Sequence, residues 1–302
     1  MDKESIPPVC ATIGNFDGVH KGHAALIREA LEIAREKELN FLLITFNPHP
    51  REILKGENEH SPLTSRDEKA RLLRELGVKN ILELPFTREI AALSAEEFVV
   101  SKLLPLNLRH LVMGHDFSLG KNRQGSRLVL DSLGQKYGFA TTQIPALEID
   151  GQIASSTRLR SLIKDGEMTK AAHILGRFFS ISGNVARGYA RGRTIGYPTA
   201  NLENVSTLVP KRGVYAVFAS WDNRRVPAIT NIGANPTFSG DRETIETFFL
   251  NDSADVYGKN LSLEFVRRIR PERRFDGADA LTRQIADDVA RAAEILNHAM
   301  SS

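Results

Sequence analysis

The chain has 302 residues, of which 41% are hydrophobic and 25% charged, and 40 Lys and Arg against 37 Asp and Glu give a formal net charge of +3. This composition is typical of a globular protein long enough for two domains, and it excludes the disordered and fibrous classes. The near-neutral charge argues neither for nor against nucleic acid, and no apolar run approaches the roughly 20 residues of a membrane helix. We expect a cytoplasmic protein that binds small molecules and neither nucleic acid nor a membrane.

The first half of the chain alternates short apolar strands with amphipathic helices. Strands are predicted at 8–13, 40–46, 80–86, 109–113 and 139–144, and helices at 24–35, 69–76, 98–104 and 155–164. Ser65 and Ser94 each precede a glutamate by three residues, a spacing typical of a capping box. Cys10, the single cysteine, lies in the first strand and is expected to be a buried hydrophobe. This alternation predicts βαβ units and a largely parallel sheet.

The pattern changes near residues 165–177. A short helix is predicted at 168–175, ending at Gly176, and short β-branched or aromatic runs follow at 213–221, 226–232, 245–250 and 261–266. Gly, Asn, Asp and Pro separate these runs, which predicts an antiparallel barrel or sandwich. A helical pattern at 277–300 is expected to cover one side of it. We therefore predict two domains, 1–167 and 168–302.

Two histidines, His20 and His23, lie three residues apart in the sequence Gly-Asn-Phe-Asp-Gly-Val-His-Lys-Gly-His at 14–23. The motif joins a predicted strand to a predicted helix, where α/β sheets bind ligands and where the helix N-terminus attracts anions. Imidazoles there can stabilise charge on a phosphate oxygen. The three glycines are expected to let the backbone approach a ligand closely. A zinc site with Asp17 as a third ligand is the weaker alternative, because that set is incomplete.

A second candidate phosphate site is the sequence Ser-Ser-Thr-Arg-Leu-Arg at 155–160. It combines three hydroxyls, a predicted helix N-terminus and two guanidinium groups. An ordinary N-cap with solvated arginines is the alternative interpretation. Neither the P-loop signature nor the dinucleotide sequence Gly-x-Gly-x-x-Gly is present, which argues against a P-loop kinase or a dehydrogenase in the first domain.

In the second half, a loop rich in glycine and arginine at 183–201 suits a nucleoside triphosphate with its magnesium. Thr199 and Asn201 can supply hard oxygen ligands to that ion, although a glycine-rich barrel turn is the alternative. Glu246 lies in an otherwise apolar strand, where it either faces solvent or acts as a base. The alternation alone favours solvent.

Together these motifs resemble the prokaryotic bifunctional riboflavin kinase and FAD synthetase family over nearly the whole chain. The resemblance rests on 14–23, on Thr-Phe-Asn-Pro-His-Pro at 45–50, on 155–160, on Gly-Arg-Thr-Ile-Gly-Tyr-Pro-Thr-Ala-Asn at 192–201, on 213–215, 231–237, 257–258 and 270–272, and on Glu246. It implies a Rossmann-like nucleotidylyltransferase domain followed by a riboflavin kinase barrel with a C-terminal helix.

The resemblance also implies two successive reactions. In the second domain, Glu246 would act as the base on a riboflavin hydroxyl while Thr199 and Asn201 hold Mg²⁺ on ATP, giving FMN. In the first domain, His20 and His23 would stabilise the transfer of AMP from a second ATP to FMN, giving FAD and pyrophosphate. There are two alternatives. Either only one of the two activities is live, or the protein is a non-catalytic module that binds a flavin or a nucleotide.

Further binding residues follow from the same resemblance. Those implied for ATP and pyrophosphate are Gly14, Asn15, Phe16, Asp17, Gly18, Gly22, Ser155, Ser156, Thr157, Arg160, Gly192, Arg193 and Gly196, and those implied for the flavin in the first domain are Asn47, His49 and Asp116. The chain departs from the commonest family pattern at four positions. Asn47 stands where Asp is usual, Ser118 and Leu119 replace an Arg-Phe pair, and Phe248 stands where many members have His.

Overall fold

The computed structural model describes residues 6–55, 61–186, 197–234, 243–250, 252, 254–273 and 275–301. The chain divides into two compact units, Met1–Ser155 and Ser156–Ser302. By its packing, the helix that follows Ser155 belongs to the second unit. The predicted boundary between the two catalytic domains, at 167/168, stays a prediction.

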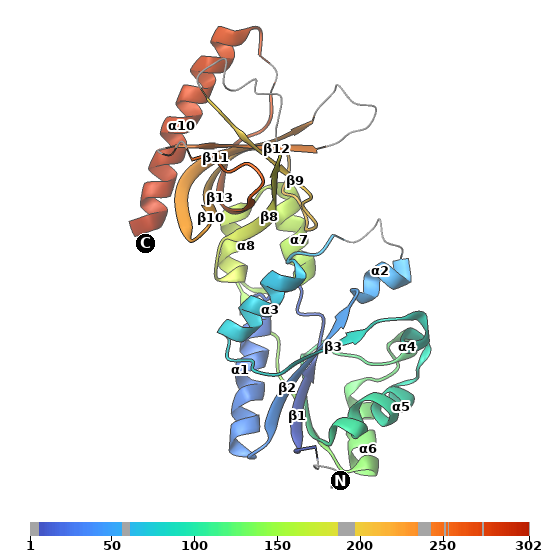
Figure 1. The fold of residues 1–302 in the computed structure, drawn as a ribbon. Helices are drawn as coiled ribbons and strands as arrows, with labels where there is room; N and C mark the ends of the chain where they lie inside the picture. Colours follow the sequence, from blue (N-terminus) through green and yellow to red (C-terminus); the bar gives the residue numbers. More distant parts are fainter. Residues whose placement is uncertain are drawn as a thin grey trace. The chain divides into compact units, whose positions relative to one another are not determined.

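A five-stranded parallel sheet forms the centre of the first unit (Figure 1). Its strands are β1 (Val9–Ile13), β2 (Asn40–Asn47), β3 (Ile81–Pro85), β4 (Leu108–Met113) and β5 (Ala140–Gln143), in the spatial order β3-β2-β1-β4-β5. The order reverses between β1 and β4, and the carboxyl ends of strands at such a point are where open α/β sheets bind ligands. The predicted parallel sheet is confirmed.

Helices cover both faces of this sheet. On one face α1 (Lys21–Glu36) and α3 (Arg66–Glu75) bury Ile27 and Leu73 against Cys10 and Leu43. On the other face α5 (Ala95–Phe98) and α6 (Arg127–Tyr137) pack with Ala11 and other strand residues. Burial raises the pKa of the Cys10 thiol to about 11, so this cysteine is an inert core residue, as expected.

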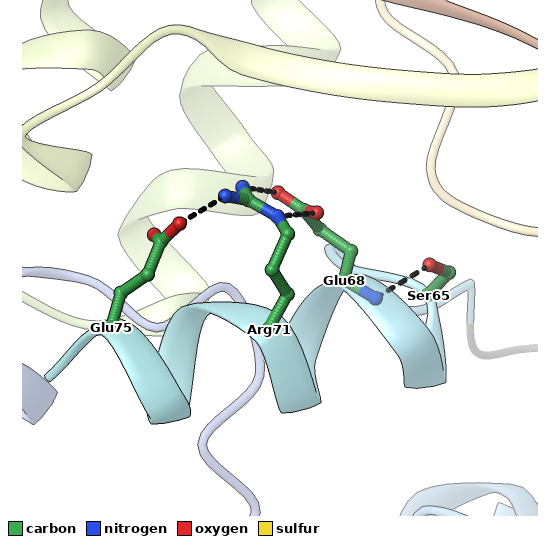
Figure 2. A network of polar contacts seen from close by, with 4 residues as sticks. All are labelled: Ser65, Glu68, Arg71 and Glu75. Atoms are coloured by element: carbon green, nitrogen blue, oxygen red, sulfur yellow. Dashed lines mark hydrogen bonds and ion pairs between the residues drawn. The ribbon is translucent and has the colours of Figure 1, made fainter. Parts of the chain in front are cut away.

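The two predicted capping boxes differ in the structure. Ser94 and Glu97 form the full reciprocal box at the start of α5. Ser65 accepts a hydrogen bond from the Glu68 N–H at 3.3 Å, but the Glu68 carboxylate binds Arg71 through both oxygens (Figure 2). Arg71 also contacts Glu75 one turn later, so the start of α3 has a one-sided cap followed by a surface ion-pair chain.

Shorter elements complete the first unit. They are α2 (Pro50–Lys55), α4 (Arg88–Ala92), a π-helical turn (Val99–Leu103), two 3₁₀ turns (Leu104–Leu106 and Lys121–Arg123) and the hairpin β6 (Glu148–Ile149) and β7 (Gln152–Ile153). The predicted helix 98–104 is therefore a composite of α5 with the π and 3₁₀ turns, because Pro105 and the left-handed Asn107 end regular helix there.

A closed antiparallel barrel forms the second unit, after α7 (Ser156–Asp165) and α8 (Met168–Leu175). Its strands are β8 (Phe179–Ala186), β9 (Ala200–Glu203), β10 (Gly213–Trp221), β11 (Arg224–Ala234), β12 (Glu243–Phe249) and β13 (Asn260–Arg270), closing in the order β10-β11-β12-β9-β8-β13. Thr230 and Thr247 are both fully buried and hydrogen-bond each other at 2.9 Å between hydroxyl oxygens. Of the two predicted architectures, the structure has the barrel.

The C-terminal helix α10 (Ala278–Ser301) covers one side of the barrel, as expected (Figure 1). Ala292 and Leu296 are fully buried against Ala216 and Phe218 of β10. An ion pair between Arg270 of β13 and the buried Asp288 of α10, at 2.8 Å, joins the helix to the strand. No helix within the described ranges is long and apolar enough to cross a membrane.

Candidate active sites

His20 and His23 lie at the N-terminus of α1, directly after β1. His20 is the N-cap residue, and its Nδ1 accepts a hydrogen bond from the backbone N–H of His23 at 3.2 Å. In a neutral imidazole this leaves the proton on Nε2. The two rings stack with centroids 3.7 Å apart, and Phe16 packs edge-on against His23 at 5.3 Å. Both imidazoles are therefore held at the positive end of a helix dipole.

The loop before these histidines has an unusual backbone. Phe16, Gly18 and Val19 have φ values of 50°, 83° and 39°, in the left-handed region. A side chain on Gly22 would begin 3.0 Å from Nδ1 of His20 and 3.1 Å from the carbonyl oxygen of Ala154. Gly22 thus makes room for groups of the protein itself, which is a different reason from the expected approach to a ligand.

Asp17 is buried, and its Oδ1 accepts hydrogen bonds from the backbone N–H groups of Leu63 and Thr64 at 2.8 and 3.4 Å. These bonds tie the histidine loop to the segment before α3. Among the described residues no cluster of three His, Cys, Asp or Glu side chains could hold a metal. The zinc alternative is therefore wrong for that part of the chain.

The segment after β2 carries the second predicted motif of this unit. The Asn47–Pro48 peptide bond is cis, and the Asn47 side chain is exposed. His49 caps the start of α2, because its Nδ1 accepts from the Arg51 N–H at 3.1 Å and its own N–H donates to Glu52 at 3.3 Å. Asn47 and His49 thus lie at the carboxyl end of β2, next to β1 in the sheet.

Asp116 lies in the turn after β4, on the other side of β1. Its side chain is 77% exposed, and its Oδ1 is 3.9 Å from Nδ1 of His115. Arg123 donates to Ser118 Oγ at 2.7 Å and to the Asp116 carbonyl oxygen at 2.9 Å. Ser118, which departs from the commonest family pattern, therefore helps to hold this turn. Arg123 holds the turn from the other side of these hydrogen bonds and was not predicted from the sequence.

The predicted phosphate sequence at 155–160 spans the division between the units. Ala154, in the first unit, is buried with its carbonyl oxygen beside Gly22, so the chain that enters this sequence lies at the histidine loop. Ser156, Thr157 and Arg160 lie in the first turns of α7, in the second unit. The predicted helix N-terminus at this sequence is confirmed.

In the second unit, Glu246 lies in a row of polar side chains across three barrel strands. It is the direct cross-strand partner of Asn201 on β9 and of Asn231 on β11. Direct partners point to the same face of a sheet, and since Ile245 and Thr247 on either side are buried, this is the outer face. All three side chains are half-buried.

The surroundings of Glu246 are aromatic on one side and acidic on the other. Phe248, two residues along the same face, packs edge-on against Tyr197 with ring centroids 5.2 Å apart. A Cβ on Gly233 would collide with an Oε of Glu272, so this glycine leaves room for that carboxylate beside Asn231. The departure at Phe248 therefore forms a wall of the candidate site.

Thr199 lies just before β9 and is half-buried, two residues from Asn201. Threonine and asparagine oxygens are hard ligands that suit Mg²⁺, which keeps waters and phosphate oxygens as its other ligands. The pair fits such an ion bound together with a nucleotide. Gly192, Arg193 and Gly196, also predicted for ATP, lie outside the described residues. Asn231 was not among the predicted site residues, although it begins one of the motifs that carry the resemblance, and the strand register places it next to Glu246.

Two family models match the chain. FAD synthetase matches residues 2–158, and riboflavin kinase matches residues 175–296. The chain is 38% identical over 285 residues to the bifunctional riboflavin kinase/FMN adenylyltransferase of Escherichia coli strain K12, covering 94% of this chain and 91% of that protein. It is 36% identical over 292 residues to the Bacillus subtilis protein of the same name, covering 95% and 92%.

A solved structure described as a macrolide-efflux protein from Streptococcus pneumoniae is also similar. Its TM-score is 0.85 at 32% identity, and the match covers 93% of each chain. The two family models together extend over both units, and the two bacterial relatives are matched over more than nine tenths of their length. The chain belongs to the family of bifunctional riboflavin kinase/FMN adenylyltransferases.

Proposed function

We propose that the protein makes FAD from riboflavin in two steps. The second unit transfers the γ-phosphoryl group of ATP to riboflavin, giving FMN, and the first unit transfers AMP from a second ATP to FMN, giving FAD and pyrophosphate. The observation that carries the proposal is the presence of a separate constellation in each unit, the stacked histidine pair at α1 and the Asn201–Glu246–Asn231 row on the barrel.

In the kinase reaction, Glu246 accepts the proton of the riboflavin 5′-hydroxyl as that oxygen attacks the γ-phosphorus. Asn201 and Asn231 are its direct cross-strand neighbours, one on each side, and would orient the carboxylate. Thr199 and Asn201 would hold Mg²⁺, which would neutralise phosphate charge. Catalysis then depends chiefly on positioning and charge neutralisation. Gly192, Arg193 and Gly196 remain proposed contacts to the phosphates.

In the adenylyl transfer, an FMN phosphate oxygen attacks the α-phosphorus of ATP, and the bond to the β-phosphate oxygen breaks. His20 and His23, at the N-terminus of α1, stabilise the charge that develops on the α-phosphate. Backbone groups of the Gly14, Asn15 and Gly18 loop bind the nucleotide phosphates. We propose that the leaving pyrophosphate is held by Ser155, Ser156, Thr157 and Arg160. The flavin would be held by Asn47, His49 and Asp116.

The direct test is an incubation of the purified protein with riboflavin, ATP and Mg²⁺, with the flavins resolved by chromatography over time. FMN is expected first and FAD after it, and removal of Mg²⁺ with EDTA should stop the formation of FMN. If neither product forms, the proposal fails. If FMN accumulates and supplied FMN is not converted, only the kinase is live, which is the alternative that the departures at Ser118 and Leu119 raise.

A further inference from the structure

Lys69, on α3, reaches the carboxyl edge of the sheet between two of the motifs described above. Its Nζ donates a hydrogen bond to Oγ1 of Thr45 at 3.2 Å. Thr45 is fully buried, and its hydroxyl donates in turn to the carbonyl oxygen of Asn15 at 3.3 Å. The ammonium group therefore lies against a hydroxyl that links the end of β2 to the histidine loop after β1.

The two carboxylates whose charges act most strongly on Lys69 already bind other groups. Glu83, cross-strand from Thr45, pairs with Arg66 at 2.7 Å, and Asp17 accepts from two backbone N–H groups. An ammonium group has three N–H donors, and the described part of the chain supplies a hydroxyl but no ion-pair partner for this one. Two donors are thus available to a ligand.

Partial burial makes this charge costly in the protein alone. Desolvation lowers the pKa of Lys69, while the charges of Glu83 and Asp17 act in the opposite direction and only partly offset it. A half-buried cation with unused donors is stabilised when an anion arrives beside it, because the attraction is strong where water is scarce.

We propose that Lys69 binds a phosphate group in the adenylyltransferase site. The inference rests on the proposed function and deepens it. Two substrates carry the required chemistry, the triphosphate of ATP and the phosphate monoester of FMN. Either would place an anionic oxygen beside Nζ at the edge where β1 and β2 end.

The test replaces Lys69 with Met, which removes the charge and the donors, and with Gln, which keeps a donor for Thr45 but not the charge. Conversion of supplied FMN to FAD is measured with ATP and FMN varied in turn. We expect kcat/KM to fall about 10- to 100-fold in both variants, as for the loss of a hydrogen bond to a charged group. The substrate whose KM rises identifies the bound phosphate.

Lys79→Gln, at an exposed position after α3, is the matched control and should behave as the unmodified protein. FMN formation from riboflavin should be unchanged in all variants, since it belongs to the other unit. If Lys69→Gln keeps its kcat/KM within threefold, Lys69 is only a tether for Thr45 and the inference is wrong. Should the Met variant fail to fold, the Gln variant decides. An unmodified protein that makes no FAD would instead contradict the proposed function.

Discussion

In the first unit the site residues lie on loops and a helix start at one edge of a parallel sheet, whereas in the second unit they lie side by side on strands of a barrel. His20 and His23 are placed by left-handed backbone at Phe16, Gly18 and Val19. Glu246 is placed by strand register with Asn201 and Asn231. The loop-built site therefore depends on local backbone geometry, and the strand-built site depends on the integrity of the whole barrel.

The largest effect is expected from a change to the ion pair that joins α10 to the barrel. Asp288→Ala leaves Arg270 without the partner that binds it at 2.8 Å, and the Asp288 side chain is only 4% exposed. Removing one member of a buried pair costs about 3–5 kcal/mol. The free energy of unfolding of the second unit should fall by that order, and FMN formation should fall with it.

Trp221, the single tryptophan, lies in β10, so its fluorescence during urea unfolding reports on this unit. Asp287→Ala, at the exposed neighbouring position, should leave the transition unchanged. Conversion of supplied FMN to FAD should be unchanged in Asp287→Ala and should fall less than FMN formation in Asp288→Ala, because of the residues proposed for that reaction only Ser156, Thr157 and Arg160 lie in the second unit. Equal loss of the two activities in Asp288→Ala would show that the sites do not depend on separate scaffolds.

A smaller effect is expected from a change to the loop-built site. In Gly22→Ala the new methyl group would meet His20 Nδ1 at 3.0 Å and the Ala154 carbonyl oxygen at 3.1 Å. Neighbouring groups must move to relieve contacts this close, which costs about 1–3 kcal/mol and shifts the ring of His20. FAD formation from supplied FMN should fall about tenfold, with FMN formation unchanged. Glu29→Ala, on the exposed face of α1, is the control, and equal rates in the two variants would contradict the account.

The smallest effect is a pH dependence of the stability of the first unit, caused by a buried histidine in the parallel sheet. His110 on β4 is buried, its Nε2 lies 2.8 Å from Thr142 Oγ1, and its Nδ1 has no hydrogen-bond partner among the described residues. Burial lowers the pKa of His110 below its ordinary value of 6.5. The stability contributed by the neutral imidazole is therefore complete above pH 6.5 and is lost as the pH falls from 6.5 through the folded-state pKa.

Urea unfolding followed by circular dichroism at pH 7.5 and 5.5 checks this, with the Trp221 signal identifying the part of the transition that belongs to the barrel. The first unit of the unmodified protein should be less stable at the lower pH, and the loss should be smaller in His110→Phe, which cannot take up a proton. The same loss in both proteins would exclude His110 as its cause.

Sequence patterns predicted the regular elements well where periodicity is strong. The helix at 168–175 and the strand at 213–221 have the predicted bounds. The helix α6 was not predicted, because it follows a polar turn at 121–126 and exposes Leu128 and Val129. Closure of the barrel could not be read from the sequence either, since it requires β8 to pair with β13, about 80 residues away along the chain.

The residues of the candidate sites were also predicted only in part from the sequence. Motif residues such as His20 and Glu246 stood out by residue type and spacing, but Asn231 is adjacent to Glu246 only through the register of β11 and β12. Lys69 lies in a helix whose sequence is that of an ordinary charged surface helix. Its position at Thr45 depends on how α3 packs on the sheet, which no local pattern specifies.

The central claim is that each reaction has its own site, and product analysis of two variants tests it most directly. With riboflavin, ATP and Mg²⁺, Glu246→Gln should lower FMN formation about 100-fold or more, yet convert supplied FMN to FAD at the unmodified rate. His23→Ala should form FMN normally and accumulate it, with FAD formation lowered about 100-fold. If either single substitution abolishes both reactions in a folded protein, the assignment of separate sites is contradicted.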